Sequence, residues 1–162
     1  MTVDLDFDLP NEGAGDPRVS LAALSEENDW IGLLFQRDHH CGNCRRQVQA
    51  VAERYDEFRE RDAEVVSIVP EPPEKVQEWQ TSYDLPFPLL SDAQKEVSDR
   101  YDQPFRFGPL GNLSDLVGRM PKAVVLDTRA ETPAVVYAHE GSSTWDRPEI
   151  DDLLGAIDDA AD

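Results

Sequence analysis

Two apolar runs with an amphipathic segment between them characterise the first half of the chain. Residues 30–35 and 63–69 are mostly apolar without alternation, which is typical of strands buried on both faces of a sheet. Between these runs, the segment Cys44–Asp62 carries apolar side chains at steps of three and four, which predicts a helix with one face against a core. The order strand, helix, strand predicts a right-handed parallel βαβ unit.

Further short elements follow the second apolar run. Pro72 and Pro73 predict the start of a helix, because proline is tolerated in a first turn. Residues 87–90 form a short apolar piece, and residues 92–101 are expected to form another helix. The segment 102–119 is too long for a plain connection, so we expect either a short helix or a functional loop there.

The last third of the chain predicts a hairpin and a closing helix. Residues 123–126 and 134–138 are strand-like and are separated by a polar turn, which favours antiparallel pairing. The closing helix is expected to have Asp146 as its N-cap, with Glu149 three residues later. A βαβ unit followed by ββα predicts an α/β fold with a mixed central sheet and helices on both faces.

The length of the chain fits one domain. Its 162 residues contain no internal repeat, so we expect a flexible acidic N-terminal arm over residues 1–16 and a single domain over 17–162. No window is apolar enough for a membrane span, and the acidic N-terminus lacks the features of a secretory signal. We therefore expect a cytoplasmic protein.

The charge of the chain is strongly negative. The 34 acidic and 15 basic residues give a net charge of −19, which argues against nucleic-acid or anionic membrane partners. Only Lys75, Lys95 and Lys122 are lysines, and the other basic residues are arginines. This composition resembles that of proteins from salt-loving archaea, in which salt screens self-repulsion.

The two cysteines of the chain stand three positions apart, as Cys41 and Cys44. They lie between a predicted buried strand and the first turn of the following helix. Unpaired N–H groups and the positive end of the helix dipole stabilise a thiolate at such a position. Arg45 and His40 are expected to add positive charge beside the pair. This arrangement predicts a dithiol that forms and breaks a disulfide without unfolding.

Helix phase predicts different roles for the two sulfurs. Cys44 precedes Val48 by four residues on the core-facing stripe, so we expect it to be the more buried sulfur. Cys41 precedes the helix and is expected to be exposed. For disulfide exchange, this makes Cys41 the first nucleophile and Cys44 the resolving thiol.

Histidines next to the cysteines leave a different class of function open. His39, His40, Cys41 and Cys44 are zinc or copper ligand types within six residues. Adjacent histidines point in different directions, however, and no second pair of ligands closes a tetrahedron. We therefore expect neither a resident metal nor a cofactor, and we keep a metal-binding or redox-sensing module as the alternative of another class.

The order of elements, together with Cys41-Gly42-Asn43-Cys44 and Pro121 before a strand, resembles the thioredoxin fold. Pro121 would then be a supporting residue, in a cis peptide bond facing the disulfide. Residues 20–158 resemble more narrowly the peroxiredoxin-like branch (alkyl hydroperoxide reductase/thiol-specific antioxidant, or redoxin). The stretches that suggest this branch are 63–69, 85–92 and 146–149.

The resemblance implies an antioxidant thiol-dependent oxidoreductase, but the sequence departs from the peroxiredoxin signature Pro-x-x-x-Thr-x-x-Cys. If the peroxide-reacting thiol is Cys44, then Cys41 replaces the threonine and Arg37 the proline. Pro121 stands near the position of the family's late arginine. These departures favour thiol–disulfide exchange, with a thiol peroxidase as the alternative in which Cys44 reacts with peroxide and Cys41 resolves. The partners implied are a protein disulfide or hydroperoxide substrate and a thioredoxin-type reductant.

Overall fold

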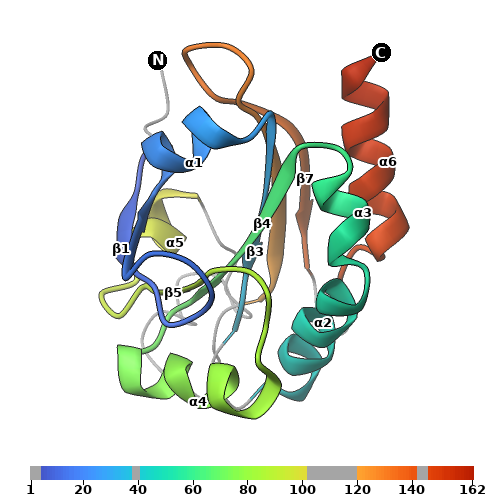
Figure 1. The fold of residues 1–162 in the computed structure, drawn as a ribbon. Helices are drawn as coiled ribbons and strands as arrows, with labels where there is room; N and C mark the ends of the chain where they lie inside the picture. The colour runs from blue at the N-terminus through green and yellow to red at the C-terminus, as the bar shows by residue number, and fades with distance from the viewer. Residues whose placement is uncertain (1–4, 38–40, 102–119, 142–145) are drawn as a thin grey trace.

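A five-stranded mixed sheet forms the centre of the molecule in the computed structural model, which describes residues 5–37, 41–101, 120–141 and 146–162. The strand order is β5-β4-β3-β6-β7 (Figure 1). β3 pairs in parallel with β4, as does β4 with β5, whereas β6 is antiparallel to both β3 and β7. This confirms the mixed sheet predicted from the sequence. The strands are β3 (Trp30–Phe35), β4 (Ala63–Val69), β5 (Leu89–Ser91), β6 (Lys122–Asp127) and β7 (Ala134–Glu140).

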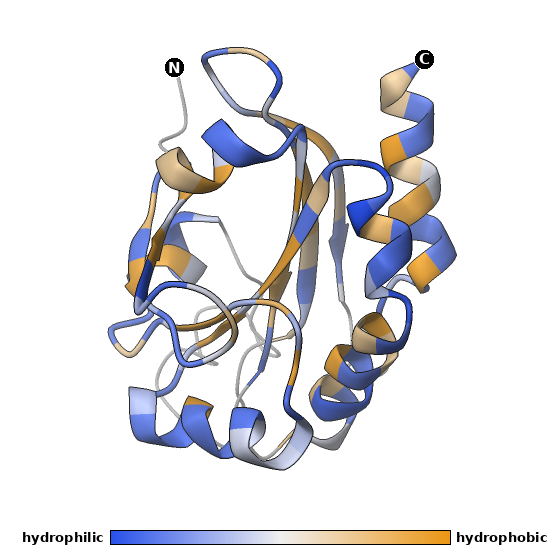
Figure 2. Ribbon diagram, in the orientation of Figure 1, coloured by the Kyte–Doolittle hydropathy of each residue, from blue (hydrophilic) through white to orange (hydrophobic). Residues whose placement is uncertain are grey.

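Helices cover both faces of this sheet, as predicted. In Figure 1, α2, α3 and α6 lie on one side of the sheet and α1 and α5 on the other. Their apolar sides face the sheet in Figure 2. None of the helices within the described ranges is long and apolar enough to cross a membrane. The helices are α1 (Leu21–Glu27), α2 (Gly42–Glu53), α3 (Tyr55–Arg59), α4 (Pro73–Tyr83), α5 (Glu96–Arg100) and α6 (Ile150–Ala161).

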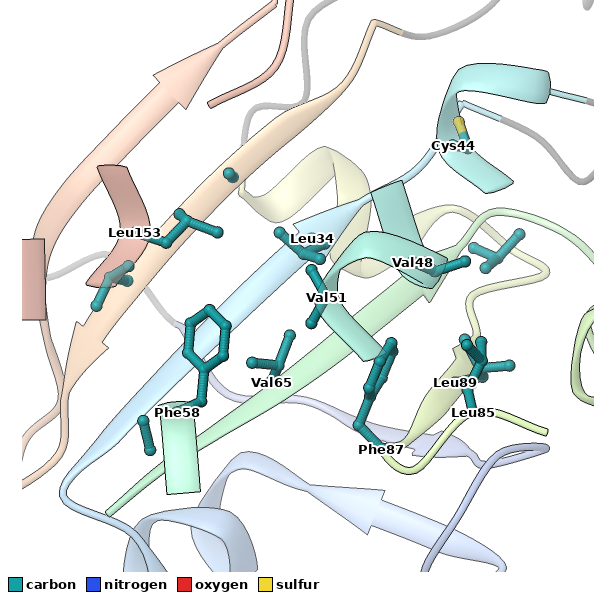
Figure 3. Close-up of a cluster of buried hydrophobic side chains, with 14 of the residues drawn as sticks. Leu34, Cys44, Val48, Val51, Phe58, Val65, Leu85, Phe87, Leu89 and Leu153 are labelled. Carbon is teal, nitrogen blue, oxygen red and sulfur yellow. The ribbon is translucent and has the colours of Figure 1, made fainter. Parts of the chain in front are cut away.

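Each face of the sheet carries its own apolar core. Figure 3 shows the core beneath α2, α3 and α6, in which Phe58 and Val51 lie close to Val65 of β4. Cys44 lies at one edge of this cluster. The opposite core contains Ile31 and Leu33 of β3, whose side chains alternate with those facing the first core. Two-sided burial explains why residues 30–35 are apolar throughout.

A short hairpin precedes the sheet. β1 (Asp8–Pro10) pairs antiparallel with β2 (Arg18–Ser20), and the buried Asn11 accepts a hydrogen bond from the backbone N–H of Leu89 in β5. Residues 8–10, within the segment 1–16 expected as a flexible arm, thus pair with a strand of the domain. The boundary at residue 16 stays a prediction, and the expected loop or helix at 102–119 lies outside the described residues.

Three predicted helices have wrong boundaries, and the helix expected over residues 92–101 covers only Glu96–Arg100. The helix expected over Cys44–Asp62 is interrupted at Arg54, whose backbone leaves helical geometry with φ −115° and ψ 18°. This divides the segment into α2 and α3. The last helix begins at Ile150 with Glu149 as its N-cap, rather than at Asp146, because Glu149 and Asp152 form a reciprocal capping box. Residues 146–149 therefore precede the helix.

Candidate active site

The cysteine pair lies where β3 leads into α2. Cys41 is the N-cap of α2, and its Sγ accepts a hydrogen bond from the backbone N–H of Cys44 at 3.2 Å. The two sulfurs are in disulfide contact, and the Cα atoms are 5.2 Å apart, within the range that a disulfide spans. The positive end of the α2 dipole faces this pair. The predicted placement of both cysteines at a helix N-terminus is therefore confirmed.

The burial of the two cysteines confirms only half of the expectation. Cys44 is fully buried, and Cys41 has 5% of its surface exposed, so the order is as predicted. The expectation that Cys41 is exposed is wrong, because it packs into the same core cluster as Cys44 and Val48. A reaction partner must therefore reach the pair through a small opening, or the segment around Cys41 must move.

A partly buried arginine contacts both sulfurs. Nη2 of Arg147 lies 2.8 Å from Sγ of Cys44 and 3.5 Å from Sγ of Cys41. The backbone N–H of Arg37 also points at Cys44 Sγ, at 3.4 Å. Burial lowers the pKa of Arg147 to about 10, so its guanidinium is still positively charged at neutral pH. These donors and this charge favour a thiolate at Cys44 when the disulfide is reduced.

The segment that carries Arg147 is held against the sheet. Asp146 Oδ1 lies 2.9 Å from Nε2 of His139 on β7, and the N–H of Gly141 donates to the carbonyl of Pro121 at 2.8 Å. A Cβ at Gly141 would lie 2.7 Å from the carbonyl oxygen of Asp146 and 2.8 Å from Cγ of Pro121. Only glycine allows this close approach, which brings the segment before α6 towards the sulfurs.

A groove of about 550 Å³ runs between α2 and the start of α6 and reaches Arg147. Asn43, Arg46 and Gln47 line it from α2, and Pro148 and Ile150 line it from the other side. Arg147 thus lines this groove and also contacts the sulfurs, so the groove lies next to the redox pair.

Comparison with known proteins assigns the family. The sequence profile of the AhpC/TSA family matches residues 4–134. The chain belongs to the AhpC/TSA family. Among curated relatives, the thiol-disulfide oxidoreductase ResA of Bacillus subtilis is 28% identical over 130 residues, covering 74% of this chain and 71% of ResA. Chloroplastic peroxiredoxin Q of Sedum lineare is 34% identical over 99 residues, covering 60% of this chain and about half, 48%, of that protein.

Solved structures of the family share the fold. The peroxidoxin BcpB of Mycobacterium tuberculosis superposes with a TM-score of 0.76 at 24% identity, covering 95% of this chain and 92% of BcpB. At this level of identity the likeness establishes the thioredoxin-like fold alone. Together with the family assignment, it confirms the fold class expected from the sequence.

The structure describes only two of the residues that were predicted to support the cysteine pair, Arg45 and Pro121. His39 and His40 lie outside the described residues. Arg45 lines a hollow against α4 together with Glu74 and Glu78. The peptide bond before Pro121 is trans, so the expected cis proline is wrong. Pro121 instead packs against Gly141 and, through it, lies next to the segment that bears Arg147.

Sequence analysis missed Arg147 as a site residue. The expected N-cap at Asp146 would have placed Arg147 in the first turn of a helix, whereas the helix begins three residues later, at Ile150. Pro148 was the available signal, because the residue before a proline is biased away from helical geometry towards an extended backbone. Nothing in the sequence, however, relates that segment to cysteines about one hundred positions earlier.

Proposed function

We propose that this protein is a thiol–disulfide oxidoreductase that cycles Cys41 and Cys44 between a dithiol and a disulfide. Its family consists of thiol-dependent oxidoreductases, and ResA, a relative over most of the chain, is one by name. The observation that carries the proposal is the disulfide contact of the two sulfurs at the N-terminus of α2, with Arg147 beside them.

The reaction transfers two electrons. In the direction of substrate reduction, a Cys41 thiolate attacks the substrate disulfide, forms a mixed disulfide and displaces one substrate thiolate. Cys44 then attacks Cys41 Sγ, releases the second substrate thiol and closes the Cys41–Cys44 disulfide. A thioredoxin-type dithiol returns two electrons and two protons to the pair. This assignment of roles rests on the greater exposure of Cys41.

A peroxidase activity is the second candidate, and the position of Arg147 favours it. The guanidinium lies closer to Cys44 Sγ than to Cys41 Sγ, and both residues are buried, which suits a small substrate. The Cys44 thiolate would attack the terminal peroxide oxygen and, with one proton, release an alcohol or water and leave a sulfenic acid. Condensation with the Cys41 thiol then yields the disulfide and one water.

Two single substitutions distinguish these candidates, because the chain has no other cysteine. Insulin reduction and hydroperoxide consumption are measured in parallel for wild type, Cys41→Ser and Cys44→Ser. Disulfide exchange requires that Cys41→Ser abolish insulin reduction and that Cys44→Ser trap a mixed disulfide with the substrate. A first turnover of peroxide that survives Cys41→Ser but not Cys44→Ser would instead identify a peroxidase.

The metal-binding or redox-sensing module remains a proposal of another class. The cysteines of the pair are present as expected, but His39 and His40 lie outside the described residues. Zinc or copper that copurifies stoichiometrically, and is lost in a His39→Ala, His40→Ala double variant, would favour it.

The net charge of −19 and the few lysines support the further proposal that the protein works in the salt-rich cytoplasm of a halophile.

A further inference from the structure

The helix that carries the cysteines differs in charge from the rest of the chain. Acidic residues outnumber basic ones by 34 to 15 in the sequence, yet residues 42–52 of α2 contain Arg45 and Arg46 and no acidic residue. Arg46 is exposed and lines the groove between α2 and the start of α6. The surface next to the redox pair therefore carries basic side chains in an otherwise strongly acidic protein.

The charged side chains that line this groove differ in how far they are already paired. Arg54 donates to Asp151 at 2.7 Å, and the carboxylate of Glu149 caps the N-terminus of α6. Arg46 donates to Oδ1 of Asn43 at 2.8 Å, and among the residues that the structure describes no carboxylate pairs with its guanidinium. Arg46 is thus the charge in the groove that an incoming carboxylate can neutralise.

The groove is long enough for an extended chain. Its lining on α2 begins at Asn43, between the two cysteines, and reaches Arg54 at the C-terminal end of the helix. At about 1.5 Å per residue this distance is about 16 Å, the length of about five residues in extended conformation. Half-buried Ala50, Pro148 and Ile150 add apolar surface to its walls. These dimensions favour a peptide segment whose own cysteine lies at the Asn43 end.

We propose that this groove binds an acidic, extended segment of the protein partner whose disulfide exchanges with Cys41 and Cys44. A carboxylate close to the partner's cysteine in sequence pairs with Arg46, and an apolar side chain further along packs on Pro148 and Ile150. Charge pairing of this kind determines the orientation and association rate of a partner more than its total affinity. The inference rests on the proposed function and deepens it, because it names the class of protein disulfide that the pair reduces.

Peptide disulfides that differ only in charge test the groove. Capped peptides Ala-X-Cys-X-Leu, in which X is Glu, Gln or Lys, are oxidised to homodisulfides, and kcat/KM for their reduction is measured with dithiothreitol as the reductant. In about 0.1 M KCl the Debye length is about 10 Å, so contacts persist while distant charges are screened. The net charge of −19 alone favours the Lys peptide. We expect the opposite order, with the Glu peptide reduced about fivefold faster than the Lys peptide.

Substitutions inside and outside the groove assign this preference to its residues. Arg46→Glu should reverse the order of the peptides, whereas Arg46→Lys should keep it because lysine retains the charge. Ala50→Phe, which fills the groove, should lower kcat/KM for all the peptides about tenfold and leave the rate at which dithiothreitol reduces the Cys41–Cys44 pair unchanged. Arg18→Glu makes the same change of charge at an exposed position of the β1–β2 hairpin, away from α2 in Figure 1, and should behave as wild type.

The possible outcomes separate this inference from the proposed function. A wild-type protein that reduces the peptides without preference, or prefers the Lys peptide, would overturn the inference and leave disulfide exchange intact. A preference for the Glu peptide that persists in Arg46→Glu would also overturn it, because another surface would then bind the carboxylate. A wild-type pair that reduces neither insulin nor any of the peptides would overturn the proposed function together with the inference.

Discussion

Arginines occur in two regions around α6, along its contact with the residues 54–61 and in the segment just before it, and the two regions use the side chain in different ways. Along the seam between α3 and α6, Arg54 bonds to Glu57 and Asp151, and Arg61 bonds to Asp158 at 2.8 Å. Each of these arginines has carboxylate partners, and their hydrogen bonds raise the pKa of both guanidinium groups. The charges are compensated at the surface, where they link one helix to the other.

Beside the sulfurs, Arg147 has the opposite environment. It is largely buried, it donates to two amide oxygens and to sulfur, and burial lowers its pKa to about 10. The comparison teaches that the partner, not the residue type, decides what an arginine does. The carboxylate bonds of Arg54 and Arg61 link neighbouring elements at the surface, whereas Arg147 places its guanidinium beside the sulfurs.

Removal of the Arg147 charge is expected to have the largest effect. Arg147→Gln should slow the reaction of the reduced pair about a hundredfold, because the charged donor that contacts both sulfurs is lost. The rate of thiol alkylation at pH 7 and the turnover with insulin or hydroperoxide measure this. Arg61→Gln on the α3–α6 seam is the matched control, and it should leave both rates unchanged. Equal losses in the two variants would show that Arg147 acts only through stability.

Displacement of the Arg147 segment should have the next largest effect. Gly141→Ala places a Cβ within 3 Å of Asp146 and Pro121 atoms, so the segment before α6 must shift. We expect the variant to unfold about 1–3 kcal/mol more easily and to lose roughly tenfold in thiol reactivity. Gly155→Ala in α6, where a Cβ meets no neighbour within 4 Å, is the control and should be neutral or slightly stabilising. Unfolding in urea and alkylation rates measure the two effects.

Salt is expected to change the stability of the fold more than the reactivity of the cysteine pair. Because the chain carries a net charge of −19, we expect its Tm to rise by several degrees between 0.1 and 2 M KCl as self-repulsion is screened. Cys44 is fully buried and its contact with Arg147 is partly buried, so the midpoint of thiol alkylation should change much less over the same range. A Tm that does not depend on KCl would contradict the proposed adaptation to salt. A thiol midpoint that follows the salt concentration would show that Arg147 is solvated.

The fold was predictable because its signals are local. Residues 30–35 are apolar throughout and residues 63–69 mostly so because both faces of the sheet are covered, and this lack of alternation identifies them as central strands. The cysteine pair at the start of α2 was predictable for the same reason. Cys41 and Cys44 are only three residues apart, so the start of the helix alone brings their sulfurs together. Helix phase also gave the correct order of burial for Cys44 and Cys41.

The rest of the site depends on contacts between distant segments. Arg147 approaches Cys44 across 103 positions, and Gln36 meets Ser67 across 31. The first contact depends on the close approach at Gly141 and on the true start of α6, and the second on how β3 and β4 are aligned. None of these follows from periodicity. The assumed exposure of Cys41 failed because a helix phase says nothing about what covers the residue before the helix.

The smallest expected effect concerns the ion pair between Arg61 and Asp158. The hydrogen bond from Arg61 lowers the pKa of Asp158 below its ordinary value of 3.8, so the pair stabilises the fold above that pH and loses its contribution as the pH falls through the lowered pKa. Asp158→Asn should therefore lower Tm by about 1 °C or less at pH 7, because the pair is exposed, and the difference from wild type should shrink as the pH falls through the lowered pKa of Asp158. Thermal melts at pH 7, 5 and 2.5 measure it, and Asp159→Asn, which removes the same charge one position away, is the control. A Tm difference that is the same at all three pH values would mean that packing of the Asp158 side chain, and not its charge, stabilises the contact with Arg61.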